Sequence, residues 1–393
     1  MHTNGDLNYS NHSTARVVLY GFTSQWFLVP QGTGIIAVVL HQLDYQFHGL
    51  HVISYIFWLL TIVLLVSMLL VYLVRCLLFP RHILNAVKHD LSESACLASI
   101  SISYTSIIQM MVLALVQDGS WGKGWGIAAY VMWWTNVAMA VAVVVVVPFL
   151  HVRLYPSGVP HLAPGSQLPM IAALTAATGG GTICQGAQVS VPLQIPVIVV
   201  SYMLIGLGLP LAFALDVLFW ARLLDRSLPD RQHTFQDMIL CGPWGQGSFA
   251  LQILGNVVLS GSFASYNSGT FLTAAAAGPV GYVSMFAGLM SWGMGTFWWI
   301  FAIVSILHGA TDHWRPRRIP YGLVAWSIVF PWGVYTNAAV QLGKLLDSRA
   351  FKVWSTALAI MLVIAWLWNM AMSLRGVVRG SMLGLDHGWK RHV

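Results

Sequence analysis

Charged residues are scarce in this chain of 393 residues: Asp, Glu, Lys and Arg together make up 8%, whereas hydrophobic residues make up 57%. A soluble domain usually carries about 25% charged residues. The composition therefore excludes an ordinary soluble enzyme or binding domain. It predicts a protein that lies mostly within a lipid bilayer.

Signatures of catalysis and of cofactor binding are also absent. The sequence has no glycine-rich nucleotide-binding loop, so we expect no ATP-driven transport by this chain alone. No Ser-His-Asp or paired-carboxylate arrangement is evident, and we expect no enzyme. The four cysteines lack CxxC or zinc-type spacing and are interpreted as small buried hydrophobic residues. His48 and His51 are three residues apart without an evident third ligand, so the sequence predicts neither a metal site nor a cofactor.

What is present is a series of ten long apolar stretches, each near the roughly 20 residues that a helix needs to cross a bilayer. They predict an all-α membrane protein with one domain, 26–374, between a polar N-terminal tail, 1–25, and a basic C-terminal tail, 375–393. The predicted spans are 26–43, 51–79, 92–116, 124–150, 168–188, 192–224, 234–260, 276–308, 321–346 and 350–374.

The distribution of basic residues predicts the orientation. With ten spans, fifteen of the 19 Lys and Arg residues fall on the side that holds both termini. Basic residues favour the cytoplasmic side of short loops, so we expect both termini in the cytoplasm. Protease protection in sealed vesicles tests this, and an external C-terminal tag would contradict it. The net charge of +7 is then a consequence of topology, and no nucleic-acid partner is expected.

Proline and glycine recur in the odd-numbered spans. Pro30, Pro243 and Pro331 lie in the first, seventh and ninth spans, and the fifth contains Gly179-Gly180-Gly181. The third has a run of Ser and Thr instead. A broken helix is tolerated in a membrane only where protein or water satisfies its free backbone groups. The pattern predicts five helical hairpins, in which odd helices surround a central path and even helices brace them. Close helix packing is the alternative explanation for each single glycine.

Several motifs carry a family resemblance. Gln31-Gly32-Thr33-Gly34, Trp133-Trp134, the segment 168–181, the run Gly242-Pro243-Trp244-Gly245-Gln246-Gly247-Ser248-Phe249 and the run 326–333 stand in this order. Together they resemble the tellurite-resistance/dicarboxylate transporter family, which includes fungal sulfite efflux pumps and is related to plant slow anion channels. The resemblance implies five hairpins in quasi-fivefold arrangement around a pore. It also implies a phenylalanine gate beside the proline of the ninth helix, here Phe330, and a homotrimer.

Two positions depart from the family pattern. Asn136 stands where family members often have an Asp after the paired tryptophans, and Ile100-Ser101-Ile102-Ser103 replaces a Phe-Pro-x-Gly element. The first difference places any proton coupling at this position in doubt, and the second predicts a differently shaped pore wall. A second candidate for coupling is Asp216, deep within the sixth span. Its alternative role is a pairing with Arg222 or with water near the helix end.

The sequence therefore predicts a plasma-membrane transporter for a small anion, with sulfite or bisulfite first and malate or another dicarboxylate second. A membrane sensor or assembly subunit without transport is a third possibility. Each predicted lining residue has the alternative role of a helix–helix contact. The predicted lining residues are Thr33, Gly34, Ser101, Ser103, Thr178, Gly180, Gln246 and Ser248.

Overall fold

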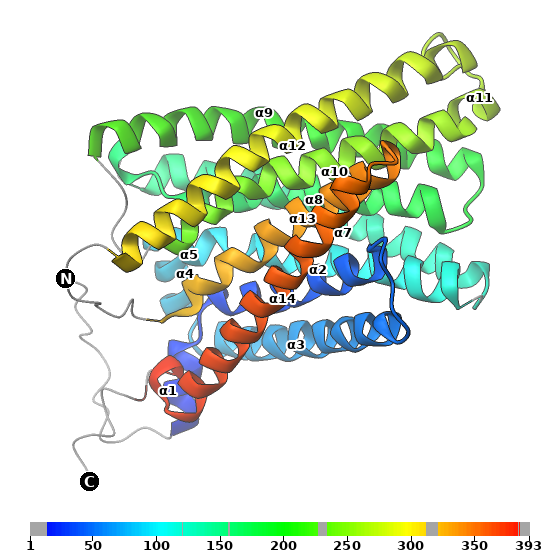
Figure 1. Ribbon diagram of the computed structural model, residues 1–393. Helices are drawn as coiled ribbons and strands as arrows, with labels where there is room; N and C mark the ends of the chain where they lie inside the picture. The colour runs from blue at the N-terminus through cyan, green and yellow to red at the C-terminus, as the bar shows by residue number, and fades with distance from the viewer. Residues whose placement is uncertain are drawn as a thin grey trace.

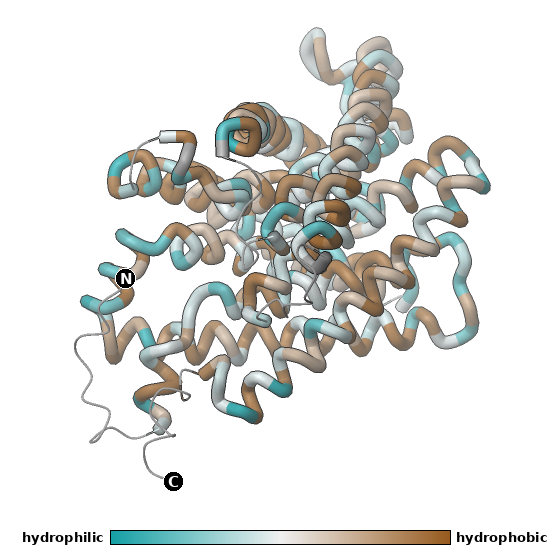
Figure 2. The backbone as a smooth tube through the Cα atoms, turned by 60° about the vertical axis from the view of Figure 1, so that its left-hand side comes forward, coloured by the Kyte–Doolittle hydropathy of each residue, from teal (hydrophilic) through white to brown (hydrophobic). Residues whose placement is uncertain are grey.

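The computed structural model describes residues 14–119, 121–155, 158–226, 234–311, 321–383 and 385. Within these ranges the regular elements are all helical, apart from one isolated bridge between Ser268 and Leu272. Most of the long helices run side by side, as Figure 1 shows. Apolar residues cover much of the length of the helices, and many of the polar residues lie toward their ends (Figure 2).

Helices form where the sequence predicts spans, and the helices of the even-numbered spans differ from the predicted ends by up to four residues. The predicted span 350–374, for example, is α14, Arg349–Val378, and the predicted span 168–188 is α8, Leu168–Gly186. The α-helices of the third, seventh and ninth spans begin six to eight residues later than predicted. Three short α-helices lie outside the predicted spans: α1 (Thr14–Gly21), α4 (Pro80–His89) and α11 (Phe263–Tyr266). The first and last described segments meet, because α1 contacts the 3-10 helix η9 (Ser381–Leu383).

Eight of the described helical segments are long and apolar enough to cross a membrane. The segments that correspond to the first and fifth predicted spans are not among them. Helix α2, Leu28–Gln42, has 15 residues and is therefore about 22 Å long, against a hydrocarbon core of about 30 Å. Helix α8 has 19 residues, about 28 Å.

Burial divides the long helices into two groups. Each of the eight segments contains an apolar stretch of 18 residues. In Leu91–Asp118, Thr234–Tyr266 and Leu323–Leu345, between 72% and 89% of this stretch is buried, whereas in the other five segments at most 39% is buried. Nearly every residue of α2 and α8 is also buried. We call α2, α6 (Ala98–Met111), α8, α10 (Cys241–Val257) and α13 (Val329–Leu345) the inner helices. The outer helices are α3 (Leu50–Leu78), α7 (Lys123–Leu154), α9 (Val191–Arg226), α12 (Ala274–Thr311) and α14.

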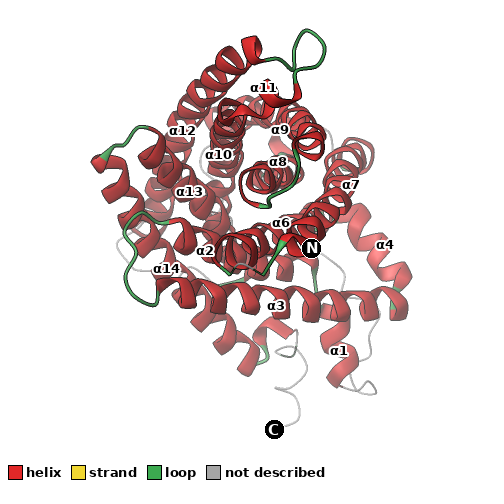
Figure 3. Cartoon of the chain, turned by 90° about the vertical axis from the view of Figure 1, so that its right-hand side faces the viewer, coloured by secondary structure: helices red, strands yellow, loops and turns green. Residues whose placement is uncertain are grey.

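The contacts among these helices are regular. Each inner helix contacts the next in the cyclic order α2, α6, α8, α10, α13 and back to α2. Each outer helix packs against the inner helix before it in the chain and also against the next inner helix in that cycle. Figure 3 shows the labels of the inner helices nearer the middle and those of the outer helices nearer the rim.

A short lead-in precedes each inner helix. It is a 3-10 helix before α2 (η2, Ser24–Phe27), α8 (η5, Pro164–Gln167), α10 (η6, Thr234–Leu240) and α13 (η8, Leu323–Ile328), and a short α-helix before α6 (α5, Leu91–Ala95). Pro30, Pro243 and Pro331 are each the third residue of the α-helix that follows. Proline is tolerated in a first turn because the N–H groups there have no partner within the helix.

The glycines of the fifth span do not interrupt it. Gly179, Gly180 and Gly181 lie within the continuous helix α8, so the predicted break there is wrong. A side chain at Gly181 would place its Cβ 2.4 Å from a methyl carbon of Ile253 on α10. These small residues therefore serve close helix packing, the alternative that the sequence left open.

A buried ion pair joins three elements where the chain enters α2. The Arg75 guanidinium on α3 donates to Glu93 Oε1 at 2.6 Å, and both side chains are only 2% exposed. Glu93 also accepts hydrogen bonds from the Tyr72 hydroxyl at 3.1 Å and from the Ser24 backbone N–H at 2.9 Å. The carboxylate thus fixes η2, α3 and α5 relative to one another.

We predict that Glu93→Gln destabilises the protein by about 3–5 kcal/mol, because it leaves the Arg75 charge buried without a partner. The matched control is Asp347→Asn, which removes a carboxylate that is 92% exposed and pairs with Lys352. Thermal unfolding of both variants in detergent measures the difference. Equal melting temperatures would show that the Glu93 pair does not stabilise the fold.

Candidate functional site

The inner helices enclose a cluster of uncharged polar side chains, which we call the amide–threonine cluster. It consists of Gln109 on α6, Thr178 and Thr182 on α8, and Gln246 on α10. The Gln246 amide donates to the Thr178 hydroxyl at 2.8 Å. The Gln109 amide donates to the hydroxyls of Thr178 at 3.3 Å and Thr182 at 3.1 Å. The cluster therefore links three inner helices that are neighbours in the cycle.

Thr178 and Thr182 lie four residues apart on α8. Residues four apart lie on the same face of an α-helix. Each hydroxyl donates its own hydrogen to a carbonyl of α8, Thr178 to Thr175 at 2.7 Å and Thr182 to Thr178 at 3.0 Å. Their lone pairs remain free to accept from the amides of the neighbouring helices. The direction of each hydrogen bond in the cluster is thus determined by the helix backbone.

None of these four side chains carries a charge, and all four are at most 3% exposed. The threonine hydroxyls and the Gln109 amide donate within the protein, so these neutral groups bind an oxyanion only by exchanging such hydrogen bonds, without the strong attraction of a fixed cation. Thr178 and Gln246 are among the predicted lining residues, whereas Gln109 and Thr182 are not. A glutamine between Ile108 and Met110 in an apolar span is the signal that points to Gln109.

Three other predicted lining residues form hydrogen bonds toward the outer helices. Thr33 accepts from the Trp366 indole of α14 at 3.1 Å. Ser101 donates to Asn136 of α7 at 2.8 Å. Ser248 donates to the Gly288 carbonyl of α12 at 2.7 Å. These hydroxyls tie inner helices to outer helices, and the structure does not bring them into the amide–threonine cluster.

The remaining predicted lining residues are a serine bonded within its own helix and two glycines packed against neighbouring helices. Ser103 donates to the Ser99 carbonyl of its own helix at 2.7 Å. A Cβ at Gly34 would lie 2.8 Å from Ser106 Cβ, and a Cβ at Gly180 would lie 2.2 Å from the Ser201 hydroxyl. Both glycines therefore permit close contact with a neighbouring helix.

The predicted gate residue lies in the interior. Phe330 on α13 is 2% exposed and belongs to the buried apolar core. The Pro331 carbonyl lies 4.0 Å from Cys241 Sγ, where α10 begins. Phe330 thus lies on an inner helix, and the residue after it contacts the start of another inner helix.

The two candidates for proton coupling are both bound by neutral donors. Asn136 on α7 donates to Thr105 at 2.6 Å and accepts from Ser101, so it bridges α7 and α6. Asp216 on α9 accepts from Gln167 and from the indole N–H groups of Trp244 at 2.5 Å and Trp298 at 3.0 Å. These bonds tie α9 to η5, α10 and α12.

The alternative partner of Asp216 is engaged elsewhere. The Arg222 guanidinium donates to the Leu162 carbonyl at 2.7 Å. Asp216 is 2% exposed, and three neutral donors surround its carboxylate. Neutral hydrogen bonds, rather than an ion pair with Arg222, are therefore the contacts that hold this buried acid.

Comparison with known proteins identifies the family. Residues 21–374 match the family described as SLAC1, voltage-dependent anion channel. The chain is 30% identical over 359 residues to the sulfite efflux pump SSU1 of Arthroderma benhamiae and to that of Trichophyton rubrum, with 91% of each chain covered. It is 24% identical over 363 residues to the malic acid transport protein of Schizosaccharomyces pombe, with 90% of this chain and 78% of that protein covered. These matches confirm the resemblance carried by the motifs, and the chain belongs to the SLAC1 family of voltage-dependent anion channels.

Proposed function

We propose that the protein exports sulfite or bisulfite across the plasma membrane through a path between the inner helices. The observation that carries the proposal is the amide–threonine cluster, an uncharged set of donors buried among three inner helices of an anion-channel family member. Sulfite is the first candidate because the relatives named as sulfite efflux pumps reach 30% identity. Malate or another dicarboxylate is the second, because a malic acid transport protein is also a relative.

The architecture that we propose is ten spans, arranged as five hairpins in quasi-fivefold symmetry around the path. The cyclic contacts of the inner helices and the repeated lead-in before each of them support this arrangement. In this proposal α2 and α8 cross the membrane although they are short, because outer helices and lead-in segments surround them. The spans form one domain, 26–374, between cytoplasmic tails, 1–25 and 375–393. The family resemblance adds a homotrimer in which each subunit has its own path.

Export of this kind needs no ATP. A potential of 100 mV, negative inside, contributes about 2.3 kcal/mol for each negative charge that leaves the cell. A doubly charged anion gains about 4.6 kcal/mol on exit, which supports a concentration ratio on the order of a thousandfold. A path that binds the anion weakly is then sufficient for efflux.

Flux into liposomes that contain the purified protein tests the substrate. We expect sulfite to be transported faster than malate, nitrate or chloride, because small neutral donors suit a compact oxyanion. Faster malate flux would favour the dicarboxylate alternative. Absence of flux for all four anions, in the wild type and in a variant with a widened path, would favour a sensor or assembly subunit.

We predict that Gln246→Leu lowers anion flux per folded molecule at least tenfold, because it removes a donor of the amide–threonine cluster. The matched control is Gln252→Leu on the same helix, whose amide bonds Ser248 toward α12. Size-exclusion chromatography gives the amount of folded protein, and liposome flux gives the activity. An equal loss of flux and of folded protein in both variants would assign Gln246 to helix packing alone.

We predict that Phe330→Ala raises anion conductance per folded molecule and lowers selectivity, because it removes the ring that narrows the proposed path. A packing role predicts the opposite result, a loss of about 3–5 kcal/mol of stability with lower expression and lower flux. Phe219→Ala serves as the control, since Phe219 is 1% exposed on an outer helix against Trp298. Conductance that is unchanged or lower in well-folded Phe330→Ala would refute the gate.

A further inference from the structure

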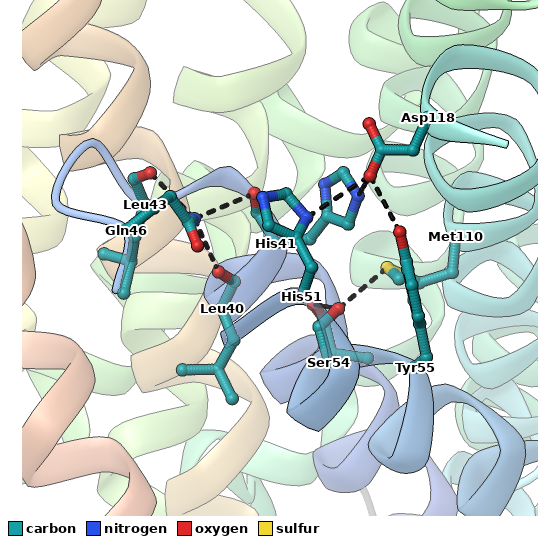
Figure 4. Close-up of polar contacts among 10 residues, drawn as sticks. Leu40, His41, Leu43, Gln46, His51, Ser54, Tyr55, Met110 and Asp118 are labelled. Carbon is teal, nitrogen blue, oxygen red and sulfur yellow. Dashed lines mark hydrogen bonds and ion pairs between the residues drawn. The ribbon is translucent and has the colours of Figure 1, made fainter. Parts of the chain in front are cut away.

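A second polar cluster lies where α2 and the continuation of α6 end, and it shares no residue with the amide–threonine cluster. His41 Nε2 on α2 is 2.8 Å from Oδ2 of Asp118, and His51 Nδ1 on α3 is 3.3 Å from the same oxygen. The Tyr55 hydroxyl donates to this oxygen at 2.8 Å. Figure 4 shows both imidazole rings and the Tyr55 hydroxyl directed at one carboxylate oxygen.

Local structure brings these residues together. The Gln46 amide donates to the carbonyls of Leu40, His41 and Leu43 at 3.0–3.2 Å, which closes the end of α2 and folds the connection toward α3. Gly49 then takes a φ of 98°, a backbone conformation that favours glycine. The chain turns back so that the rings of His41 and His51 lie 4.7 Å apart, centre to centre.

Asp118 comes from a different part of the chain. It is the last residue of a π-helical segment, η3 (Val112–Asp118), which continues α6. Such π-helical turns are rare and often occur at functional sites. His41 and His51 are 10 positions apart in the sequence, and His51 and Asp118 are 67 positions apart, so no sequence motif indicates the site. The sequence therefore predicted no metal site from His48 and His51, whereas the fold places two other residues, His41 and Asp118, beside His51.

The donor set has the chemistry of a transition-metal site. Two imidazole nitrogens and one carboxylate oxygen lie within 4.8 Å of one another. Zinc with bonds of about 2.0–2.1 Å in tetrahedral geometry requires ligand atoms about 3.3 Å apart. The distance of 3.3 Å from His51 to Asp118 matches this value, and the distance from His41 must widen by about 0.5 Å. The Nδ1 atom of His51 is buried and makes no hydrogen bond, which leaves its lone pair available.

Access from solvent also favours a cation. The side chains of His51 and Asp118 are 42% and 36% exposed, whereas His41 is 7% exposed, so an ion can enter from solvent and reach a rigid ligand. The positive charge of Lys344 acts on His41 and opposes a cation there, and its ammonium group donates to the Gln42 carbonyl at 2.7 Å. The negative charge of Asp44 acts on Lys344 in the opposite sense.

We propose that His41 Nε2, His51 Nδ1 and Asp118 bind one divalent transition-metal ion of the zinc type, with water as the fourth ligand. Tyr55 then orients the carboxylate by its hydrogen bond. In the structure the Nε2–H of His41 donates to Asp118, so a neutral His41 must move its hydrogen to Nδ1 when Nε2 binds the ion. His51 carries its hydrogen on Nε2 in the bound state, and no net proton is released by neutral imidazoles. The ion ties the α2–α3 hairpin to the end of α6.

Binding of Zn²⁺ to the purified full-length protein without a histidine tag, after treatment with a chelator, tests the proposal. We expect one ion per chain, a rise in melting temperature with zinc, and the visible absorption of tetrahedral cobalt when Co²⁺ is used instead. His51→Ala and Asp118→Asn are expected to weaken zinc binding roughly 100-fold or more, since loss of even an outer partner typically costs 10–100-fold.

The matched control is His48→Ala, because His48 is an exposed histidine in the same connection. It is expected to bind zinc like the wild type, and His51→Gln replaces His51→Ala if the alanine variant does not fold. Equal loss of binding in His48→Ala and the His51 variant, an octahedral cobalt spectrum, or no binding at millimolar zinc would overturn the proposal. These readouts do not involve transport, so they stand apart from the test of the proposed function.

Discussion

Contact between helix backbones is the constraint on which the rest of this structure depends. In lipid, helices gain no hydrophobic energy by associating, so small residues that allow close approach and van der Waals contact must hold them together. A Cβ at Gly245 would lie 2.7 Å from the Tyr335 backbone nitrogen, and a Cβ at Gly126 would lie 2.0 Å from the Ala187 carbonyl. The inner helices approach one another and the outer helices this closely because such positions carry no side chain.

Close packing also decides which polar groups the interior can contain. Ser and Thr fit between helices because their hydroxyls can donate to a carbonyl of the same helix, as Ser103, Thr175 and Thr182 do. Longer amides can reach a neighbouring helix, and Gln109 and Gln246 do so. Around the amide–threonine cluster the interior is therefore polar without being charged, and the threonine hydroxyls serve as acceptors for the amides.

The helices were predictable from the sequence because the thickness of the bilayer sets the length of an apolar run. The predicted spans 168–188 and 350–374 therefore match the ends of α8 and α14 to within a few residues. The neighbouring helix toward which each side chain points was not predictable. Thr33 and Ser248 lie on inner helices, yet they form hydrogen bonds with Trp366 and Gly288 on outer helices. His41 and Asp118 meet only because a π-helical end and a capped turn place them together, and no local spacing encodes such a contact.

The placement of charge bears on how an anion could pass. Along the segment Leu91–Asp118, the buried pair of Glu93 with Arg75 lies near one end and Asp118 lies at the other, whereas the side chains of α6 between them are uncharged. A fixed cation 4 Å from an anion would attract it by about 4 kcal/mol at an effective dielectric constant of 20. Escape would then be slowed on the order of a thousandfold. A neutral donor contributes about 0.5–1.5 kcal/mol, so two or three of them can replace water around an anion and still release it quickly. For the export that we propose, an interior of amides and hydroxyls therefore allows faster turnover than a single buried arginine would.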